Sequence, residues 1–215
     1  MRGAGEARTG LLDAGIAVIR QRGLAATTVD ELCAAAHVTK GAFFHHFTTK
    51  QAFAVAVARH WASTTEGMFA AAAYHQADQP IDRVLGYIDF REQLIDGSPA
   101  EYSCAVGTMT QEAFATSAAI RDACAAAIFD HAATLEADLS EAIALAKAPG
   151  DATAAGLARY TQAVLQGSFI LGKASDDISL AREAVGYLRD SLQRILEPAL
   201  TTAPPVSPTT TEEES

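Results

Sequence analysis

The abundance of alanine constrains the fold of this chain more than any other feature of its sequence. Alanine occupies 47 of 215 positions, against 9 Phe, 5 Tyr and 1 Trp. Alanine is the best helix former and a poor strand residue, so the sequence predicts an all-α fold. The hydrophobic share of 49% and the charged share of 20% are typical of a folded globular chain.

Apolar residues recur at helical spacing along most of the chain. Leu12, Ile16 and Ile19 share one helical face, and Gly23 ends that segment. The segment 201–215 is rich in Pro and Thr and then acidic, which predicts a disordered tail. Turn-forming residues separate further helical patterns, which we expect at about 50–69, 81–95, 105–118, 120–147, 152–174 and 178–197.

Charge and cysteine content indicate the setting of the protein. The net charge is −10, yet residues 1–60 hold seven basic and four acidic side chains. A basic end on an acidic body favours a polyanionic partner. Three cysteines are too few for a disulfide framework, and we find neither a secretory signal nor an apolar stretch of roughly 18 to 20 residues. We therefore expect a cytoplasmic protein that does not enter the membrane.

Positions 28–46 have the spacing of a helix-turn-helix. Thr27 and Thr28 each stand three residues before an acidic residue, which is the pattern of two overlapping capping boxes. A turn at 37–38 follows, and Thr39 can cap a second short helix over 40–47.

Twelve ordered positions between residues 23 and 50 form a more specific pattern. A glycine ends the first helix, and Thr-Thr-Val-x-x-Leu, an Ala-rich stretch and Val-x-x-Gly-x-Phe-Phe-x-His-Phe-x-x-Lys follow. The pattern resembles the DNA-binding domain of TetR-type (tetracycline-repressor-like) transcriptional regulators. The matching positions are Gly23, Thr27, Thr28, Val29, Leu32, Ala36, Val38, Gly41, Phe43, His46, Phe47 and Lys50.

The resemblance implies two domains and a regulatory function. It places a three-helix helix-turn-helix DNA-binding domain at 1–49 and a larger α-helical ligand-binding and dimerisation domain at 50–200. Members of this family are mostly homodimeric repressors that a small molecule releases from DNA. We therefore expect three partners, namely a near-palindromic double-stranded DNA operator, a small-molecule effector and a second copy of the chain.

The second helix of the motif provides the residues that face DNA. With its apolar side inward, Thr39, Lys40, Gly41, Ala42 and His45 point outward, where Lys40 favours guanine and Ala42 a thymine methyl. By resemblance, phosphate contacts are implied for Thr27, Thr28, His46 and Lys50.

Two residues depart from the family pattern. His37 stands where the turn usually has glycine, so we expect a positive φ there. Phe44 replaces the usual tyrosine; it lacks a hydroxyl for a phosphate, so it stacks on a sugar or a methyl or leaves that contact unmade.

Large apolar residues among the many alanines predict, as a group, a pocket for a mainly apolar ligand, although for each one alone a core position is the favoured interpretation. The residues we expect to line it are Trp61, Met68, Phe69, Phe90, Met109, Phe114 and Phe129, with Cys104, Gln111 and His131 as polar contacts.

Cys104 supports an alternative function. Residues 103–112 resemble the Gly-Cys-x-x-Gly-x-x-x-x-Glu stretch of one branch of the family, in which some members sense electrophiles through this cysteine. A sensor thiol needs a helix start or a nearby cation. Cys104 precedes a predicted helix, but no Lys or Arg lies between Arg91 and Arg121, so a core cysteine is the competing interpretation.

The segment 178–199 has the clearest helical pattern, because its apolar residues alternate at steps of three and four. With the preceding Ala- and Gly-rich helix, it predicts a four-helix dimer interface. The expected interface residues are Leu157, Tyr160, Val164, Gly167, Leu171, Ile178, Ala181, Val185, Leu188, Leu192 and Ile195.

Other functional classes find little support in the sequence. It contains no P-loop, GxSxG, CxxC or HExxH motif, so we expect no catalysis and no cofactor. Adjacent histidines such as His45 and His46 diverge by about 100° on a helix, which argues against a metal site. A ligand-independent DNA-binding protein and a helical module that does not bind DNA remain as alternatives.

Overall fold

A computed structural model describes residues 4–147 and 150–197, and the predicted tail at 201–215 lies outside them. Within the described residues the chain contains α-helices, one short 3-10 helix and no strand, which confirms the all-α prediction. The helices are α1 (Ala4–Arg22), α2 (Val29–Ala36), α3 (Lys40–His46), α4 (Lys50–Ala70), η1 (Ala73–Gln76), α5 (Pro80–Gln93), α6 (Pro99–Tyr102), α7 (Ala105–Ala113), α8 (Ala118–Ala133), α9 (Glu136–Ala146), α10 (Ala154–Ser175) and α11 (Ile178–Leu196).

The first three helices form the predicted helix-turn-helix unit. Gly23 ends α1 with a φ of +87°, a value that a residue with a side chain rarely adopts. Thr28 caps α2 in a capping box with Glu31, and His37 ends it with a φ of 54°, which confirms the positive φ predicted for the turn. Thr39 then caps α3 by accepting a hydrogen bond from the Ala42 N–H at 3.2 Å.

Aromatic packing fixes α3 against its neighbours. Phe43 is fully buried, and its ring centroid lies 5.6 Å from that of Phe47 and 5.3 Å from that of Phe53. Phe53 belongs to α4, so the same cluster joins the short α3 to a helix of 21 residues. A seven-residue helix is marginal on its own, and this buried cluster is what orders it.

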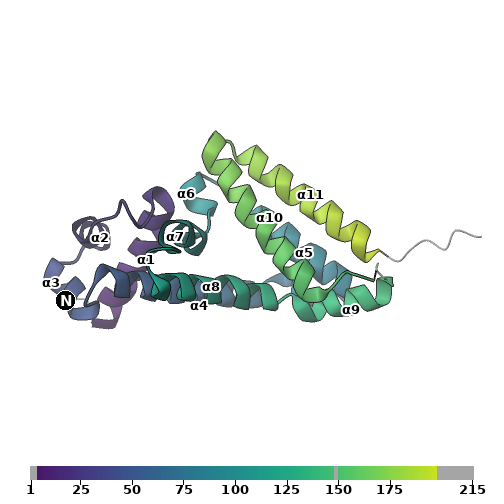
Figure 1. Cartoon of the computed structure of the whole chain (residues 1–215), viewed down its shortest axis with the longest axis horizontal. Coiled ribbons are helices and arrows are strands. Elements are labelled where there is room, and N and C mark those ends of the chain that lie inside the picture. The colour runs from purple at the N-terminus through teal and green to yellow at the C-terminus, as the bar shows by residue number, and fades with distance from the viewer. Residues whose placement is uncertain (1–3, 148–149, 198–215) are drawn as a thin grey trace, which may run out of the picture.

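The remaining helices extend the molecule away from α2 and α3 (Figure 1). Helix α4 packs along α8, while α1 packs against α4, α6 and α7. Helices α10 and α11 pair with each other and rise to an apex, with α5 beside α11 and α9 at the far end. No described helix has the length and apolarity needed to cross a membrane.

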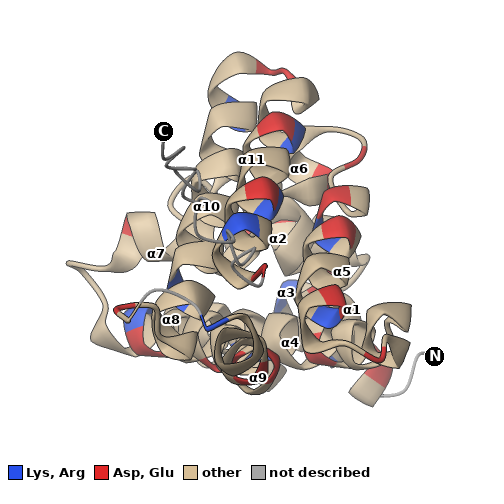
Figure 2. Cartoon of the chain, turned by 90° about the vertical axis from the view of Figure 1, so that its right-hand side faces the viewer, with Lys and Arg blue, Asp and Glu red and all other residues tan. Residues whose placement is uncertain are grey.

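Ion pairs join the helices at the end opposite to α3. Arg83 of α5 pairs with Asp138 and Glu141 of α9 at 2.7 and 3.0 Å, and Arg189 of α11 pairs with Asp89 of α5 at 2.6 Å. Acidic positions are spread over this end of the molecule, several of them beside basic ones (Figure 2).

The structure changes several predicted helix boundaries. The pattern at 105–118 ends at Ala113, and the pattern at 120–147 is two helices that break at Thr134 and Leu135. Neither Gly nor Pro marks that break. The short α6 was not predicted; a capping box of Ser98 with Glu101 begins it.

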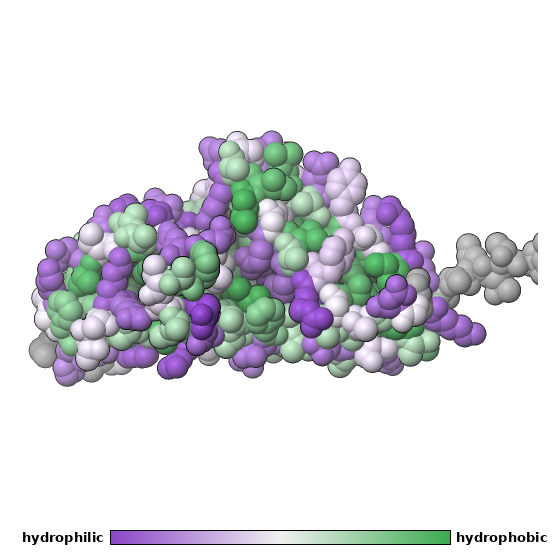
Figure 3. All heavy atoms as spheres, in the orientation of Figure 1, coloured by the Kyte–Doolittle hydropathy of each residue, from purple (hydrophilic) through white to green (hydrophobic). Residues whose placement is uncertain are grey.

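The structure also corrects the predicted dimer interface. Four residues of the α11 seam, Ala181, Val185, Leu188 and Leu192, are at most 1% exposed because this face packs α11 inside its own chain, against α5, α9 and α10. Leu157 of α10 is likewise buried. The large apolar residues that α10 and α11 leave exposed are Tyr160, Ile170, Leu171, Leu180 and Tyr187, and an apolar area is visible at the apex of these helices (Figure 3).

Candidate nucleic-acid interface and ligand cavity

The outer face of α3 presents most of the side chains predicted to contact DNA. Thr39, Lys40, Gly41, Phe44 and His45 are exposed, and Ala42 and His46 are half-buried. The Lys40 ammonium lies 2.9 Å from Asp30, but both side chains are more than half exposed, so this pair is weak enough for a phosphate or a base to displace it.

The residues before and after α3 differ in whether their side chains can reach a DNA phosphate. Thr28 is exposed at the start of α2, and half-buried Lys50 lies at the start of α4, where its ammonium donates to the Ala25 carbonyl at 3.5 Å. Thr27 is a correction to the predicted contacts. It is 1% exposed, and its hydroxyl donates to the Gly23 carbonyl at 2.6 Å, so it shapes the loop and cannot reach a phosphate.

The glutamate that ends the stretch at 103–112, to which the sequence assigned no role of its own, connects this unit to the rest of the chain. Glu112 of α7 accepts hydrogen bonds from the backbone N–H groups of Leu24 at 2.6 Å and Ala25 at 3.1 Å. Both groups belong to the loop between α1 and α2. A second link joins Gln51 of α4 to Ser117 at 2.6 Å. Glu112 therefore ties the end of α7 to the loop that precedes the helix-turn-helix.

A cavity of about 290 Å³ lies among α1, α4, α5, α6, α7, α8 and α10. Five of the ten residues predicted for the pocket line it, namely Trp61, Met68, Phe69, Cys104 and His131. The lining is therefore largely apolar, with polar groups at a few positions, which is the usual character of a small-molecule site.

The other five predicted pocket residues lie elsewhere. Met109 is fully buried in the core, and Phe90 packs its ring 5.3 Å from that of Phe69. Gln111 borders a second, neighbouring hollow that also contacts Cys104. Phe114 and Phe129 are 61% and 57% exposed, because they point outward from the end of α7 and from α8. The prediction that these two line the pocket is wrong.

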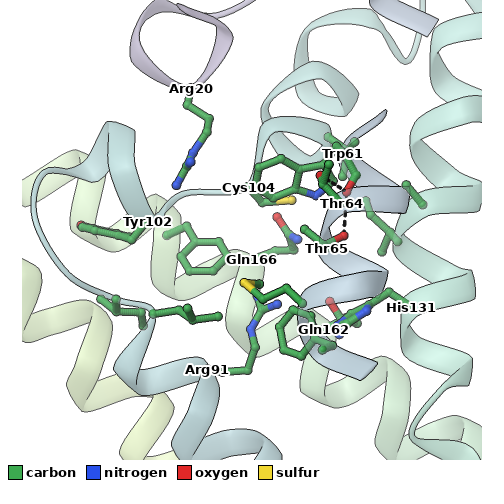
Figure 4. A pocket seen from close by; sticks show the side chains of 18 of the residues that line it. Arg20, Trp61, Thr64, Thr65, Arg91, Tyr102, Cys104, His131, Gln162 and Gln166 are labelled. Carbon is green, nitrogen blue, oxygen red and sulfur yellow. Dashed lines mark hydrogen bonds between the residues drawn. The ribbon is translucent and has the colours of Figure 1, made fainter. Parts of the chain in front are cut away.

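The cavity also contains polar side chains that the sequence did not indicate (Figure 4). Arg20 reaches into it from α1 and Arg91 from α5, while Gln162 and Gln166 enter from α10. Burial lowers the pKa of the Arg20 guanidinium below its ordinary value. Large apolar residues are the sequence signal of a pocket, and these long polar side chains carry no such signal because they come from helices far apart in the sequence.

His131 is neutral in this environment. Burial lowers its pKa to about 4, and the positive charge of Arg91 acts in the same direction. Its Nε2 lies 3.0 Å from the Tyr87 hydroxyl, which also accepts a hydrogen bond from Gln162 at 3.2 Å. Within the described residues no group of three His, Cys, Asp or Glu side chains is placed to hold a metal ion.

Cys104 occupies the N-cap of α7 and borders both hollows. Its sulfur accepts a hydrogen bond from the Gly107 N–H at 3.4 Å, and the residue is 9% exposed. Cations that are distant in the sequence lie near it, because Arg20 borders the first hollow and Lys173 the second. The other two cysteines belong to the core, and burial raises the pKa of Cys124 to about 11.

Comparisons with known proteins agree with this architecture. Residues 11–57 match the family described as "Bacterial regulatory proteins, tetR family". The chain is 28% identical over 105 residues to the HTH-type transcriptional repressor DhaR of Mycobacterium sp. (strain GP1). That match spans 49% of this chain and about half, 51%, of the length of the relative.

Solved structures show that the likeness in fold extends over nearly the whole chain. A TetR-family regulator from Agrobacterium tumefaciens is 17% identical, with a TM-score of 0.77 over 90% of this chain and 100% of the other. A TetR regulator from Chloroflexus aurantiacus is 20% identical, with a TM-score of 0.77 over 93% of this chain and 100% of the other. The reduced form of NemR from E. coli is 23% identical, with a TM-score of 0.72 over 90% of this chain and 100% of the other.

Proposed function

Because the chain belongs to the TetR family of bacterial regulatory proteins, we propose that it is a repressor that a small molecule releases from a near-palindromic operator. Helix α3 reads the operator through Lys40 and Thr39, and His46, Thr28 and Lys50 contact phosphates. The effector occupies the cavity of about 290 Å³.

One observation carries this proposal: the cavity wall is built partly from the helix-turn-helix unit itself. Arg20 of α1 lines the cavity together with Cys104, which begins α7. The far end of α7 holds the α1–α2 loop through Glu112. A ligand in the cavity therefore contacts two helices that determine where α3 lies. For tenfold release it must bind the DNA-incompetent state about 1.4 kcal/mol more tightly than the competent one.

The operator is read by a homodimer in this proposal. The exposed apolar side chains of α10 and α11, among them Leu171, Leu180 and Tyr187, supply a surface for a second copy. Two-fold symmetry places the two copies of α3 about one DNA turn, roughly 34–36 Å, apart or somewhat more.

Selection of bound sequences from random DNA tests the proposal. We expect a near-palindromic sequence to be enriched, and we expect affinity for it to fall steeply with salt, because phosphate contacts release counterions. Lys40→Ala is the test variant, and Arg159→Ala, an exposed charge on α10, is the matched control. If no sequence is enriched, or if both variants bind equally well, the proposed role of α3 is wrong.

A second candidate function is electrophile sensing by Cys104, and its position between the two hollows at the start of α7 favours it. Alkylation there would add bulk at the N-cap of the helix that ends near Glu112. N-ethylmaleimide should then release the operator from the wild type but not from Cys104→Ser. Equal release from both proteins would exclude this function.

A further inference from the structure

We propose that the cavity binds an organic carboxylate with an apolar body, and that Arg20 of α1 and Arg91 of α5 hold its carboxylate group from opposite sides. The inference deepens the proposed function, because it names the chemical class of the effector. It depends on that function only for the consequence of binding, and binding itself can be measured without DNA.

Arg20 is the first of two guanidinium groups in the cavity that have no anionic partner. Its group lies over the Trp61 ring, 5.4 Å from the centroid. Among the residues that the structure describes it makes no ion pair or hydrogen bond, and its Nε is buried without a partner. A ring face attracts the charge but satisfies none of the five N–H donors. A buried donor left unpaired costs about as much free energy as a lost hydrogen bond. A ligand that brings a hydrogen-bond acceptor to Arg20 would therefore be stabilised in the cavity.

Arg91 enters the same cavity from the other side (Figure 4). Its guanidinium lies between two rings, 5.3 Å from the centroid of Phe69 and 5.8 Å from that of Phe169. Within the described part of the chain it also lacks a carboxylate or carbonyl partner. By contrast, Arg83 and Arg189, outside the cavity, each bind a carboxylate at 2.6–2.7 Å. Arg20 and Arg91 are thus the two arginines of the cavity wall, and neither has an ion pair within the described residues.

The other titratable groups of the cavity compensate this positive charge only in part. Glu101 is the acid on its wall, but the N–H and the hydroxyl of Ser98 both donate to its carboxylate at 2.7 Å. The hydrogen bonds from Ser98 lower the pKa of Glu101, and the positive charge of Arg20 acts in the same direction, but Glu101 makes no ion pair with either arginine. One carboxylate thus faces two guanidinium groups. His131 is neutral near pH 7, since burial lowers its pKa to about 4. The cavity is therefore cationic in a chain whose net charge is −10.

These features together select the chemistry of the occupant. Guanidinium groups recognise a carboxylate by paired charge-assisted hydrogen bonds, which neutral oxygens form less strongly. Most of the remaining wall is apolar, with Met68, Phe69, Val106 and Ile128 among its residues, and its neutral polar side chains include Thr64, Thr65, His131, Gln162 and Gln166. The volume of about 290 Å³ limits the body to a small molecule. An apolar monocarboxylate fits the charge, the wall and the size.

The position of Arg20 gives the carboxylate a direct effect on the DNA-binding unit. Arg20 lies three residues before Gly23, where α1 ends and the loop held by Glu112 begins. A carboxylate that bridges Arg20 to Arg91 draws the end of α1 toward α5. The same contact that recognises the ligand thus biases the position of α2 and α3.

Trp61 allows the test to be made on the full-length protein. It is the single tryptophan of the chain, and Arg20 lies against its ring, so its fluorescence reports on occupancy. We would titrate the wild type with decanoate and 4-phenylbutanoate and with the primary amide of each, and repeat the measurement by calorimetry. At least one acid should bind about tenfold or more tightly than its amide, because only the carboxylate carries a charge opposite to that of the two guanidinium groups.

Arg20→Gln and Arg91→Gln should each remove that preference for the acid, whereas the exposed control Arg121→Gln should keep it. The acid–amide comparison uses the wild type, so it holds even if a variant folds poorly. The proposal is overturned if no acid binds more tightly than its amide, or if both folded variants keep the preference.

Operator affinity measured in the same solutions separates this inference from the proposed function. An acid that binds as described without changing operator affinity would leave the carboxylate site standing and remove the regulatory function. If a neutral compound releases the operator and acids bind no more tightly than their amides, the regulatory function would stand and the carboxylate site would be excluded.

Discussion

Replacing Glu112 by alanine removes both acceptors that hold the α1–α2 loop to α7. The hydrogen bonds concerned are short, at 2.6 and 3.1 Å, and the acceptor is a charged carboxylate. A bond to a charged group contributes about 1.5–3 kcal/mol, but Ala25 is exposed and water replaces that bond at little cost. We therefore expect the free energy of unfolding to fall by about 1–3 kcal/mol. For a chain of this size Tm should fall by about 2–4 °C for each kcal/mol.

Urea unfolding followed by circular dichroism measures this change, with Glu66→Ala as the control, because Glu66 is an exposed acid on α4. Glu112→Gln should fall between the wild type and Glu112→Ala, since its amide oxygen still accepts one bond without charge. Effector should also release the operator less from Glu112→Ala than from the wild type. If the alanine variants at 112 and 66 have equal stability and equal release, Glu112 does not couple the cavity to the loop.

Three further predictions address DNA binding, protonation and assembly. Lys40→Ala should weaken specific operator binding by about 1–3 kcal/mol in fluorescence anisotropy, with a shallower dependence on salt. The pKa of His131 falls from 6.5 in the unfolded chain to about 4 in the folded one, so the unfolded chain binds more protons between these values. Stability should therefore be complete above about pH 6.5 and fall toward pH 4, and His131→Gln should flatten that slope in urea unfolding measured across the pH range. Leu188→Arg should prevent folding, since Leu188 is 1% exposed within its own chain, whereas Tyr187→Arg, at a position 66% exposed, should fold and give a monomer in light scattering.

Local chemistry made the helix-turn-helix predictable from the sequence. The capping residues Thr28 and Thr39, the glycine that ends α1 and the positive φ at His37 all depend on neighbours within a few residues, and the structure confirms each of them. Thr27 was assigned to DNA from the family pattern. Its hydroxyl instead bonds a carbonyl four residues earlier, which the pattern does not reveal.

The spacing of apolar residues predicts which face of a helix is buried, but not which helices cover that face. The seam of α11 is buried as its spacing indicates, but it is buried against helices of its own chain. An apolar stripe does not say whether its partner belongs to the same chain or to a second copy. The cavity shows the same limit, since large side chains such as Phe114 and Phe129 lie at the surface. Its two arginines line the same cavity only because helices some 70 residues apart in the sequence fold together.

The most direct test of the proposed regulation measures operator affinity with and without a compound that occupies the cavity. The operator is the sequence selected from random DNA, and occupancy is followed by the fluorescence of Trp61. We predict that a saturating compound lowers operator affinity at least about tenfold, which corresponds to about 1.4 kcal/mol of coupling. A compound that saturates the cavity and leaves operator affinity unchanged would contradict the coupling of the cavity to α3.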